Sequence, residues 1–265
     1  MELDPGKKAK QMELKTIEKA LMVFNCFAQG DTSVSTTELA IRLNTNKATM
    51  SRVLSTLRKY DYLEQDPRTR KYRLGSAMVE MARAVHRSLD GNVTSVVAPI
   101  ANQLRDTVGE TVHLEVLSGN NLYLAYVAVT PNPISLNIGV GDQVMPNAHA
   151  GSKAIVAFSP PDVIDNWLKK DFSSYTKNTI TEPALLRKEY RKIRETGIAY
   201  DFGGYYEEIN AIGAPIFNHE NTPVAGLLIV VPSYRMQDKW EQRYIDELKK
   251  AANLISSQLR SSYRI

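Results

Sequence analysis

The chain has 265 residues, of which 43% are hydrophobic and 23% charged, a composition typical of a globular protein and not of a disordered one. This length is sufficient for two domains with separate cores. The net charge of +4 is unevenly distributed, because residues 1–90 carry 16 Lys/Arg against 11 Asp/Glu and residues 91–265 carry 17 against 18. Any nucleic-acid interaction is therefore expected in the N-terminal third.

Cysteine usage and hydropathy exclude several other classes. Cys26 is the only cysteine in the sequence, which excludes an intrachain disulfide and a CxxC metal site and predicts a buried thiol. No apolar run approaches the roughly 20 residues that span a bilayer. The first fifteen residues also lack the apolar core of a signal peptide. We therefore expect a cytoplasmic protein with a frayed N-terminus and no membrane partner.

Two helices are predicted before residue 44. The first spans residues 15–27. Four apolar residues with helical spacing are expected to face inward: Ile17, Leu21, Phe24 and Phe27. The second begins at Ser35, because Ser35 followed three residues later by Glu38 is a capping box in which each side chain satisfies a backbone N–H of the other residue. Its apolar face consists of Leu39, Ala40 and Leu43.

A polar turn at 44–46 separates the second helix from a third that starts near Lys47. One face of the third helix is apolar, with Met50, Val53, Leu54 and Leu57. The other face combines small hydroxyls with long cations, which suits a helix in the DNA major groove. The predicted contacts here are Ser35, Asn46, Lys47, Thr49, Ser51 and Arg52. A solvated helical hairpin without DNA contact is the alternative.

A short basic hairpin follows. Strands are predicted near 62–66 and 71–74, joined by a turn that starts at Pro67. Residues 42–73 contain nine Lys/Arg and three Asp/Glu. A charged hairpin tip is usually only solvated, but directly after a helix-turn-helix we favour contact with phosphates or a minor groove. The predicted contacts are Arg68, Arg70 and Lys71.

A linker helix is predicted over 76–89. Its apolar stripe consists of Met78, Met81, Ala82, Val85 and Leu89. Pairing with a second copy of the chain and packing against the preceding hairpin both fit this stripe. Asp90-Gly91-Asn92 marks a boundary. The predicted domains are 1–75, a linker at 76–90, and 91–265.

The pattern after residue 91 is α+β. Predicted helices lie near 93–108, 152–158, 161–170, 183–196 and 239–261, and predicted strands near 110–117, 122–129, 209–217 and 223–231, with a further short strand containing Leu136 and Ile138. Consecutive hairpins indicate one antiparallel sheet covered by helices. The last two long strands are apolar on both faces. Either both faces form a core, or loops enclose a ligand pocket over one face, where Ala211, Gly213 and Gly226 would leave room.

Catalysis and metal binding receive little support. His149, Ser152 and Asp201 could form a nucleophilic triad, but no Gly-x-Ser-x-Gly turn surrounds Ser152. His113 and Glu115 share one strand face, yet no third metal ligand is evident, which favours a pair on the sheet surface. No Gly-rich phosphate motif is present. We therefore expect no enzymatic activity, no cofactor and no metal.

Several segments in order resemble the IclR family of bacterial transcriptional regulators over about residues 15–261. They are Lys19-Ala20-Leu21, residues 47–54, Tyr72-Arg73-Leu74-Gly75, Ser152-Lys153-Ala154, residues 197–201, residues 211–217, and Pro232 followed by Arg235. The resemblance implies a winged helix-turn-helix, a linker helix and a GAF-like effector-binding domain. It also implies a DNA-binding regulator, in a class that includes repressors, whose affinity for a double-stranded DNA operator is modulated by a small metabolite. A homodimer or dimer of dimers is implied.

The resemblance also implies a location for the effector pocket. Carried over position by position, its residues are Ala150, Gly151, Asp201, Ile209, Ala211, Leu228 and Val230. Leu228 and Val230 stand where some relatives carry serines. After Asp201, where relatives often carry acidic residues, this chain has Phe202-Gly203-Gly204-Tyr205-Tyr206. We therefore expect an apolar wall with a few polar groups such as His149, Ser152 or Asp201.

Overall fold

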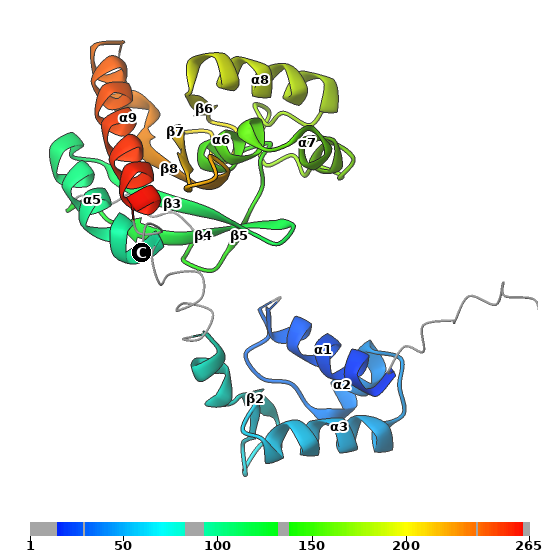
Figure 1. The fold of residues 1–265 in the computed structure, drawn as a ribbon. Helices are drawn as coiled ribbons and strands as arrows, with labels where there is room; N and C mark the ends of the chain where they lie inside the picture. Colours follow the sequence, from blue (N-terminus) through cyan, green and yellow to red (C-terminus); the bar gives the residue numbers. More distant parts are fainter. Residues whose placement is uncertain (1–14, 29, 83–92, 132–137, 237, 262–265) are drawn as a thin grey trace, which may run out of the picture. The chain divides into compact units, whose positions relative to one another are not determined.

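The structure is a computed structural model that describes residues 15–28, 30–82, 93–131, 138–236 and 238–261 (Figure 1). The chain divides into two compact units, residues 1–88 and 89–265, called the N-terminal unit and the C-terminal unit below. Within the described ranges, every helix is too short or too polar to cross a bilayer.

The N-terminal unit contains the three predicted helices and the predicted hairpin. They are α1 (Lys15–Ala28), α2 (Thr36–Arg42), α3 (Lys47–Lys59), β1 (Leu63–Gln65) and β2 (Tyr72–Leu74). Helical backbone also covers 77–82, where Met78 is half-buried and Met81 is exposed. The remainder of the predicted linker helix, with Val85 and Leu89, lies outside the described residues.

The starts of α2 and α3 follow from their caps. The Ser35 backbone N–H donates to Glu38 Oε2 at 2.7 Å, and the Glu38 N–H donates to Ser35 Oγ at 3.2 Å, which confirms the capping box. Asn46 Oδ1 accepts from the Thr49 N–H at 2.7 Å and caps α3. Asn44 adopts φ 44°, a left-handed conformation that Asn tolerates better than most residues. Short polar residues therefore set the turn between the two helices.

The buried face of α1 differs from the prediction. Cys26 and Phe27 are buried as expected, together with Val23. Ile17 and Leu21, expected inside, are 55% and 57% exposed. The helical spacing was read correctly, but the buried residues of α1 all come from its second half, so the apolar residues of its first half do not enter the core.

Backbone hydrogen bonds fix the base of the hairpin. Val34 and Tyr72 exchange two of them, with N···O distances of 2.9 and 2.8 Å, which attach the segment before α2 to β2. Beyond β2, the Gly75 N–H donates to the carbonyl of Tyr62 at 2.9 Å. A Cβ atom at Gly75 would overlap the carbonyl oxygen of Asp61. Glycine is therefore required where the chain leaves the hairpin.

The C-terminal unit is an α+β domain with one curved antiparallel sheet, in the order β5-β4-β3-β8-β7-β6 (Figure 1). Its strands are β3 (Thr111–Ser118), β4 (Asn121–Ala128), β5 (Gln143–Val144), β6 (Ala199–Phe202), β7 (Ile209–Phe217) and β8 (Pro223–Pro232). Its helices are α5 (Val93–Val108), α6 (Ala150–Phe158), α7 (Pro161–Leu168), α8 (Pro183–Thr196), the 3₁₀ turn η1 (Ser233–Arg235) and α9 (Asp238–Ser261). The predicted fold class is confirmed.

Two strand predictions need correction. Ile138 lies outside any strand, Leu136 falls outside the described residues, and the short strand is instead β5. The edge strand β6 was not predicted. It has only four residues, Ala-Tyr-Asp-Phe, and follows a glycine at φ 74° that ends α8, so alternation is too brief to show a strand.

Helices cover both faces of the sheet. Ile212, Ala214 and Ile216 of β7 face a core shared with α5 and α9, whereas Ala211 faces a second core shared with α6, α7 and α8. The expectation that Gly213 and Gly226 leave room for a ligand is wrong. A Cβ atom at Gly213 would lie 2.6 Å from the carbonyl oxygen of Ala150, and one at Gly226 would overlap the carbonyl of Gly151. These glycines let the α6 backbone lie directly on the sheet.

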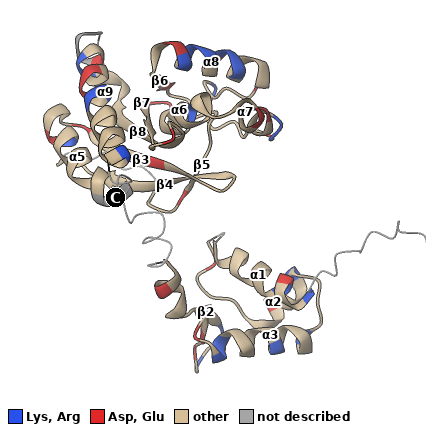
Figure 2. Ribbon diagram, in the orientation of Figure 1, with Lys and Arg blue, Asp and Glu red and all other residues tan. Residues whose placement is uncertain are grey.

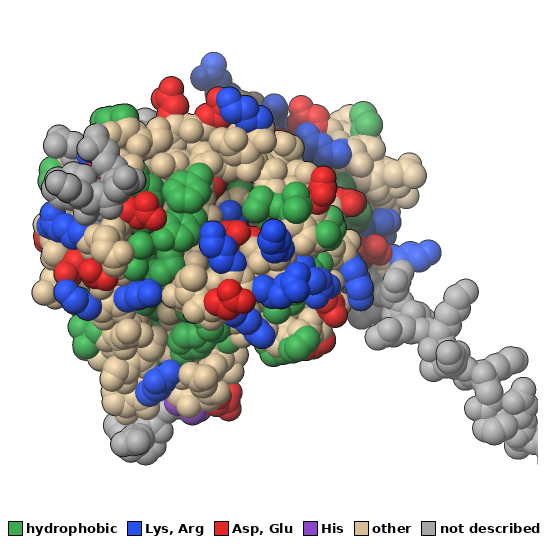
Figure 3. Space-filling model, turned by 90° about the horizontal axis from the view of Figure 1, so that it is seen from above, with side chains coloured by type: hydrophobic (Ala, Val, Ile, Leu, Met, Phe, Trp, Pro, Cys, Tyr) green, Lys and Arg blue, Asp and Glu red, His purple; other side chains and the backbone are tan. Residues whose placement is uncertain are grey.

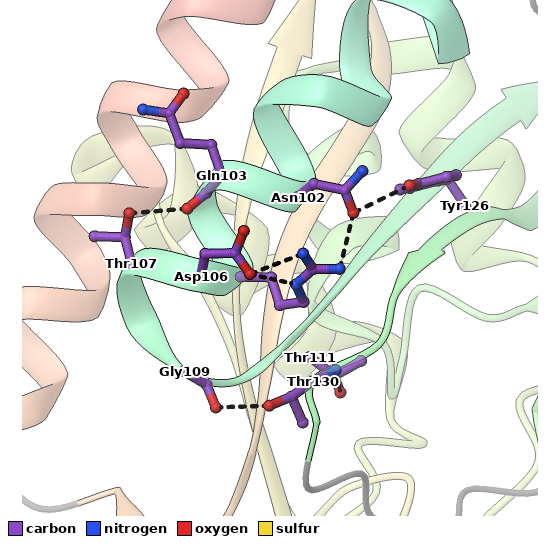
Figure 4. Close-up of polar contacts among 9 residues, drawn as sticks. Asn102, Gln103, Asp106, Thr107, Gly109, Thr111, Tyr126 and Thr130 are labelled. Atoms are coloured by element: carbon purple, nitrogen blue, oxygen red, sulfur yellow. Dashed lines mark hydrogen bonds and ion pairs between the residues drawn. The ribbon is translucent and has the colours of Figure 1, made fainter.

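Polar contacts anchor α5 to the neighbouring hairpin (Figure 4). Asn102 Oδ1 accepts from the Tyr126 hydroxyl of β4 at 3.3 Å and from Arg105 Nη1 at 3.0 Å. Beyond the helix, the Thr130 hydroxyl donates to the carbonyl of Gly109 at 3.0 Å. The end of α5 and the end of β4 are therefore held together, which fixes the helix on this face of the sheet.

Candidate functional site

The first candidate site is the outer face of α3. Met50, Val53 and Leu54 point into the core, which leaves the opposite side of the helix to solvent. The predicted contacts on this side are Lys47, Ser51 and Arg52, all exposed, and Thr49, which is half-buried. Figure 2 shows cationic residues along α3 and at the hairpin. The arrangement presents small hydroxyls next to long cations, as the sequence predicts.

Two of the predicted DNA contacts also have structural roles. Ser35 and Asn46 cap α2 and α3, so their side-chain oxygens already accept backbone hydrogen bonds. Each cap satisfies one of the N–H groups that a helix start leaves without a partner. These two residues therefore position the helix starts whether or not they touch DNA.

Two of the four cationic side chains of the hairpin form ion pairs with carboxylates of the described residues, and the other two do not. Arg73 pairs with Glu64 across the strands at 2.8 Å, and Lys71 Nζ lies 3.7 Å from the capping-box carboxylate of Glu38. Arg68 and Arg70 are exposed at the tip, and neither forms an ion pair with the residues that the structure describes. These two arginines are therefore the hairpin cations most available to an external anion.

A hydrogen-bonded turn holds the tip. Asp66 Oδ1 accepts from the N–H groups of Arg68 and Thr69 at 2.9 and 2.7 Å. The bond from Thr69 contributes most to a lowered pKa of Asp66, so this carboxylate stays ionised at neutral pH. Arg70 has φ 60°, in the left-handed region, which turns the chain back into β2. The tip has a defined backbone conformation before it meets any partner.

The second candidate site is a cavity of about 30 Å³ in the C-terminal unit. Its walls come from β3, α6, β6, β7 and β8 and from two loops: His113, Ile138, His149, Ala150, Asp201, Tyr205, Tyr206, Ile209, Ala211, Leu228 and Val230. Six of the seven predicted effector contacts lie around it. The seventh, Gly151, lies against β3 and β8, where a Cβ atom would come 2.8 Å from Glu115 Oε2.

A buried carboxylate organises the polar side of this cavity. Glu115 is fully buried and accepts from the Ser152 hydroxyl at 2.6 Å, with His149 Nδ1 3.2 Å from its other oxygen. Burial alone would raise the pKa of Glu115, but His149, Ser152 and His113 together hold it below the ordinary value. The considered triad of His149, Ser152 and Asp201 is therefore not assembled, because Glu115 binds the first two.

The histidine on β3 was misplaced by the sequence prediction. His113 is 6% exposed and Glu115 is fully buried, so they are not a pair on the sheet surface. The cause is α6, which covers the central strands on this face. Burial lowers the pKa of His113 to about 4, so its imidazole is neutral at physiological pH. Among the described residues, no group of three His, Cys, Asp or Glu is arranged to hold a metal.

Asp201 is the charged group that lines the cavity directly. It is 5% exposed, and its Oδ1 accepts from the Gly204 N–H at 2.7 Å. Burial raises the pKa of Asp201, and Lys153, Gly204 and His149 oppose the rise. Lys153 is equally buried, and its ammonium donates to the carbonyl of Tyr200 at 2.8 Å. Two opposite charges therefore share this low-dielectric region.

Tyr205 and Tyr206 line one side of the cavity, and Tyr175 packs against Tyr205; these three residues are called the tyrosine rim. The Tyr205 ring lies 4.2 Å from the His149 ring, 4.8 Å from that of Tyr175 and 4.7 Å from that of Tyr206, centre to centre. Burial contributes most to raising the pKa of Tyr205 to about 12, so its phenol stays protonated. From the sequence, Tyr205 and Tyr206 were only a departure from the family pattern. Their position just after the Gly203-Gly204 turn is the signal that could have identified them as a lining.

The outer surface of the C-terminal unit mixes charges. Figure 3 shows Lys and Arg next to Asp, Glu and apolar side chains on one face of the molecule. On α8, exposed Lys188, Arg191 and Lys192 alternate with half-buried Glu189 and exposed Glu195. Arg187 is already paired with Asp165 at 2.7 Å. The hairpin tip differs from this surface, because Arg68 and Arg70 form no ion pair with an Asp or Glu among the residues described.

Comparison with known proteins identifies the family. The pattern described as "Bacterial transcriptional regulator IclR C-terminal" matches residues 85–257, and that of the "IclR helix-turn-helix domain" matches residues 16–67. The transcriptional regulator XynR of Escherichia coli K12 is 24% identical, with 93% of this chain and 97% of that protein covered. KipR of Bacillus subtilis 168 is 27% identical, with 94% and 98% covered.

Solved structures agree. IclR of Thermotoga maritima is 27% identical, with a TM-score of 0.72 and with 93% of this chain and 99% of that chain covered. An IclR homolog from Microbacterium hydrocarbonoxydans, complexed with 4-hydroxybenzoate, shares the fold at 22% identity, with a TM-score of 0.76 and 93% and 99% covered. The chain therefore belongs to the IclR family of bacterial transcriptional regulators and is a DNA-binding regulator.

Proposed function

We propose that this regulator senses a small-molecule effector in the cavity of the C-terminal unit and that binding changes its affinity for an operator. The observation that carries this proposal is the cavity lining. Residues that are far apart in sequence, from His113 to Val230, converge there. His113, His149 and Asp201 are buried polar groups in a wall that otherwise consists of aliphatic residues and two tyrosines. A few convergent polar groups in an apolar pocket are characteristic of ligand sites.

The size of the cavity restricts how an effector enters. About 30 Å³ accommodates little more than a water molecule. An organic effector of the size of 4-hydroxybenzoate, which the related structure contains, therefore requires the lining to move. Tyr205 and Tyr206 are the natural candidates, because they line the cavity and lie on the loop between β6 and β7. We expect the tyrosine rim to shift when ligand binds.

On the DNA side, α3 is proposed to enter the major groove. Arg52 lies mid-helix, where a bidentate contact to guanine is within reach, and Ser51 and Thr49 fit closely against base edges or phosphates. Lys47 at the helix start and the arginines Arg68 and Arg70 at the hairpin tip contact phosphates. Lys71 joins them only by leaving Glu38, whereas Ser35 and Asn46 act mainly by fixing the helix starts.

The coupling is proposed to act through geometry. A homodimer, or a dimer of dimers, reads two half-sites only when its recognition helices are spaced by whole turns of the duplex, about 34 Å or a multiple. With domains at 1–75 and 91–265, a linker helix at 76–90 would carry a change in the effector domains to this spacing. A ligand shifts the balance by its difference in affinity for the two arrangements, typically about 1–3 kcal/mol.

The test starts with a thermal-shift screen of the full chain against small carboxylates, sugars and aromatic acids, with 4-hydroxybenzoate among them. A ligand at 100 times its Kd should stabilise the protein by about 2.7 kcal/mol. Operator titrations with and without the hit then follow for wild type and Ala211→Trp. The indole is larger than the cavity and occupies it by displacing part of the lining, so we expect the variant to bind operator and to lose the response to the ligand.

Two further variants make the result decisive. Leu185→Trp adds the same side chain at a site on α8 that is 53% exposed and should respond like wild type. Asp201→Asn keeps the size of the residue, removes its charge and covers the case in which Ala211→Trp does not fold. A normal ligand response in both cavity variants would place the effector elsewhere.

A further inference from the structure

Gln65 connects the recognition helix to the hairpin. Its Nε2 donates to the carbonyl of Arg70 at 2.9 Å, and its Oε1 accepts from Arg58 Nη1 at 3.0 Å. Arg58 belongs to the last turn of α3, whereas Arg70 closes the hairpin turn. The half-buried Gln65 side chain, at the end of β1, thus joins two elements that are both proposed to touch DNA.

The Arg70 peptide needs such support. A residue other than glycine with φ near 60° is uncommon, and it persists when neighbouring contacts over-determine the conformation. The Arg70 N–H donates to the carbonyl of Asp66 at 2.9 Å, and Gln65 holds its carbonyl from the other side. Both backbone polar groups of Arg70 are therefore fixed, and the Arg68 N–H is held by Asp66 Oδ1 at 2.9 Å, so the backbone that carries both arginines has one conformation.

We infer that Gln65 is a positioning residue for DNA recognition: it sets the angle between the hairpin and α3 and so presents Arg68 and Arg70 to the phosphates. This inference rests on the proposed phosphate contacts of those two arginines. A primary amide suits the role because it carries a donor and an acceptor, and both are used here. Glutamate would keep the acceptor for Arg58 but lose the donor for Arg70, and leucine would lose both.

The test is a double-mutant cycle on the full chain. Gln65→Leu and Gln65→Glu are made in wild type and in the Arg68→Ala/Arg70→Ala background, and operator affinity is measured over a range of salt concentrations. In wild type, loss of the hydrogen bonds should weaken operator binding about 3- to 10-fold and reduce the salt slope. In the background without the tip arginines, the same changes should have no further effect, since residues that act through one another are not additive.

Two measurements separate positioning from a general loss of structure. The control Glu64→Gln changes the residue next to Gln65 on β1 and removes its ion pair to Arg73 of β2. This variant should not weaken operator binding, because it loses only an exposed ion pair and a negative charge. Hydrogen exchange should increase over residues 66–71 in Gln65→Leu, while α1 to α3 remain protected. If Gln65→Leu does not fold, the double-mutant cycle is completed with Gln65→Glu alone.

The results can show that Gln65 is not a positioning residue, or that the proposed phosphate contacts themselves are absent. Equal losses in both backgrounds would show that Gln65 contacts DNA itself and would overturn the inference. Full affinity of Gln65→Leu and Gln65→Glu, with a clear loss in Arg68→Ala/Arg70→Ala, would overturn it while the phosphate contacts stand. If the double arginine variant itself binds as wild type does, the proposed phosphate contacts fail and the positioning role fails with them.

Discussion

The two units differ in where their candidate site residues lie: most of those of the N-terminal unit are exposed, whereas most of those of the C-terminal unit are buried. In the N-terminal unit, Lys47, Arg52 and the tip arginines stand outside a small core, on short elements with local capping and turn signals. In the C-terminal unit, His113 and Asp201 face inward between a sheet and its helices. An exposed site needs a scaffold only to aim its side chains, whereas an internal site exists only if the layers around it pack correctly.

The largest effect is expected from a substitution that disturbs the packing between α6 and the sheet next to the cavity. A side chain at Gly226 would overlap the backbone of Gly151, so Gly226→Val must lift α6 from the sheet. We expect the C-terminal unit to lose about 3 kcal/mol of unfolding free energy, at the upper end of the usual effect of overpacking. Denaturant unfolding of the full chain gives the magnitude, and hydrogen exchange shows which unit opens.

Gly139→Ala is the matched control, because a Cβ atom there has Asp142 Oδ2 as its nearest neighbour, at 3.9 Å. The N-terminal unit should keep its protection in both variants. If Gly226→Val exposes α1 to α3 as much as α6, then the two units unfold as one, and the contrast between them has no thermodynamic counterpart.

A second prediction concerns the exposed site. Arg52→Ala should weaken operator binding by about 2 kcal/mol and reduce discrimination against random DNA, because a base contact is lost. Lys47→Ala should weaken both DNAs alike and flatten the salt dependence by about one unit of slope. Both residues are exposed, so unfolding free energies should change by less than about 0.5 kcal/mol. Equal losses on operator and random DNA for Arg52→Ala would exclude the base contact.

The same contrast explains what the sequence could predict. The N-terminal elements follow from neighbours within a few residues, such as Ser35 with Glu38 and Asn46 with Thr49, so their boundaries were predictable. Which half of α1 is buried depends on where α3 lies, and the inward placement of Ile17 was wrong for that reason. Six cavity residues came from the family resemblance, because no local pattern brings residue 150 to residue 228.

The roles of the small and polar residues beneath α6 were the least predictable. Gly213 and Gly226 looked like space for a ligand, but the space belongs to the α6 backbone. Glu115 and His113 looked like a surface pair, since a strand sequence does not show which helix will cover it. The bond from Ser152 to Glu115 spans 37 residues, and a close approach of helix and sheet is needed to form it.

The stability of the C-terminal unit should depend on pH through the buried His113. The folded pKa of His113 is about 4, below its ordinary value near 6.5, so between these values the unfolded chain binds more protons than the folded one. The C-terminal unit should therefore lose about 1.2 kcal/mol of unfolding free energy through His113 as the pH falls from 6 to 5. Glu115, with a lowered pKa, adds a loss at more acidic pH. Asp201 opposes the loss, because burial raises its pKa and the folded state therefore binds this proton more readily than the unfolded chain does.

His113→Phe removes the titrating group and should flatten this slope, which unfolding experiments at pH 6 and pH 5 can measure. The N-terminal unit should show a smaller slope over the same interval, since its carboxylates Glu38 and Asp66 have lowered pKa values and titrate at more acidic pH. An unchanged slope in His113→Phe would mean that another histidine carries the proton uptake.

The smallest expected effect separates capping from DNA contact within the N-terminal unit. Asn46→Ala removes the cap of α3 and should cost about 1 kcal/mol of unfolding free energy. Asn46→Asp retains an oxygen that accepts from the Thr49 N–H, and its negative charge is favourable at a helix N-terminus, so stability should be maintained. On DNA, however, that charge would face phosphates if Asn46 lies at the interface, and operator affinity should fall more for Asn46→Asp than for Asn46→Ala. Unfolding and operator titrations of the two variants give the answer. If the affinities instead follow the stabilities, with Asn46→Asp equal to wild type and Asn46→Ala weaker, then Asn46 only caps α3 and does not belong to the DNA-contacting surface.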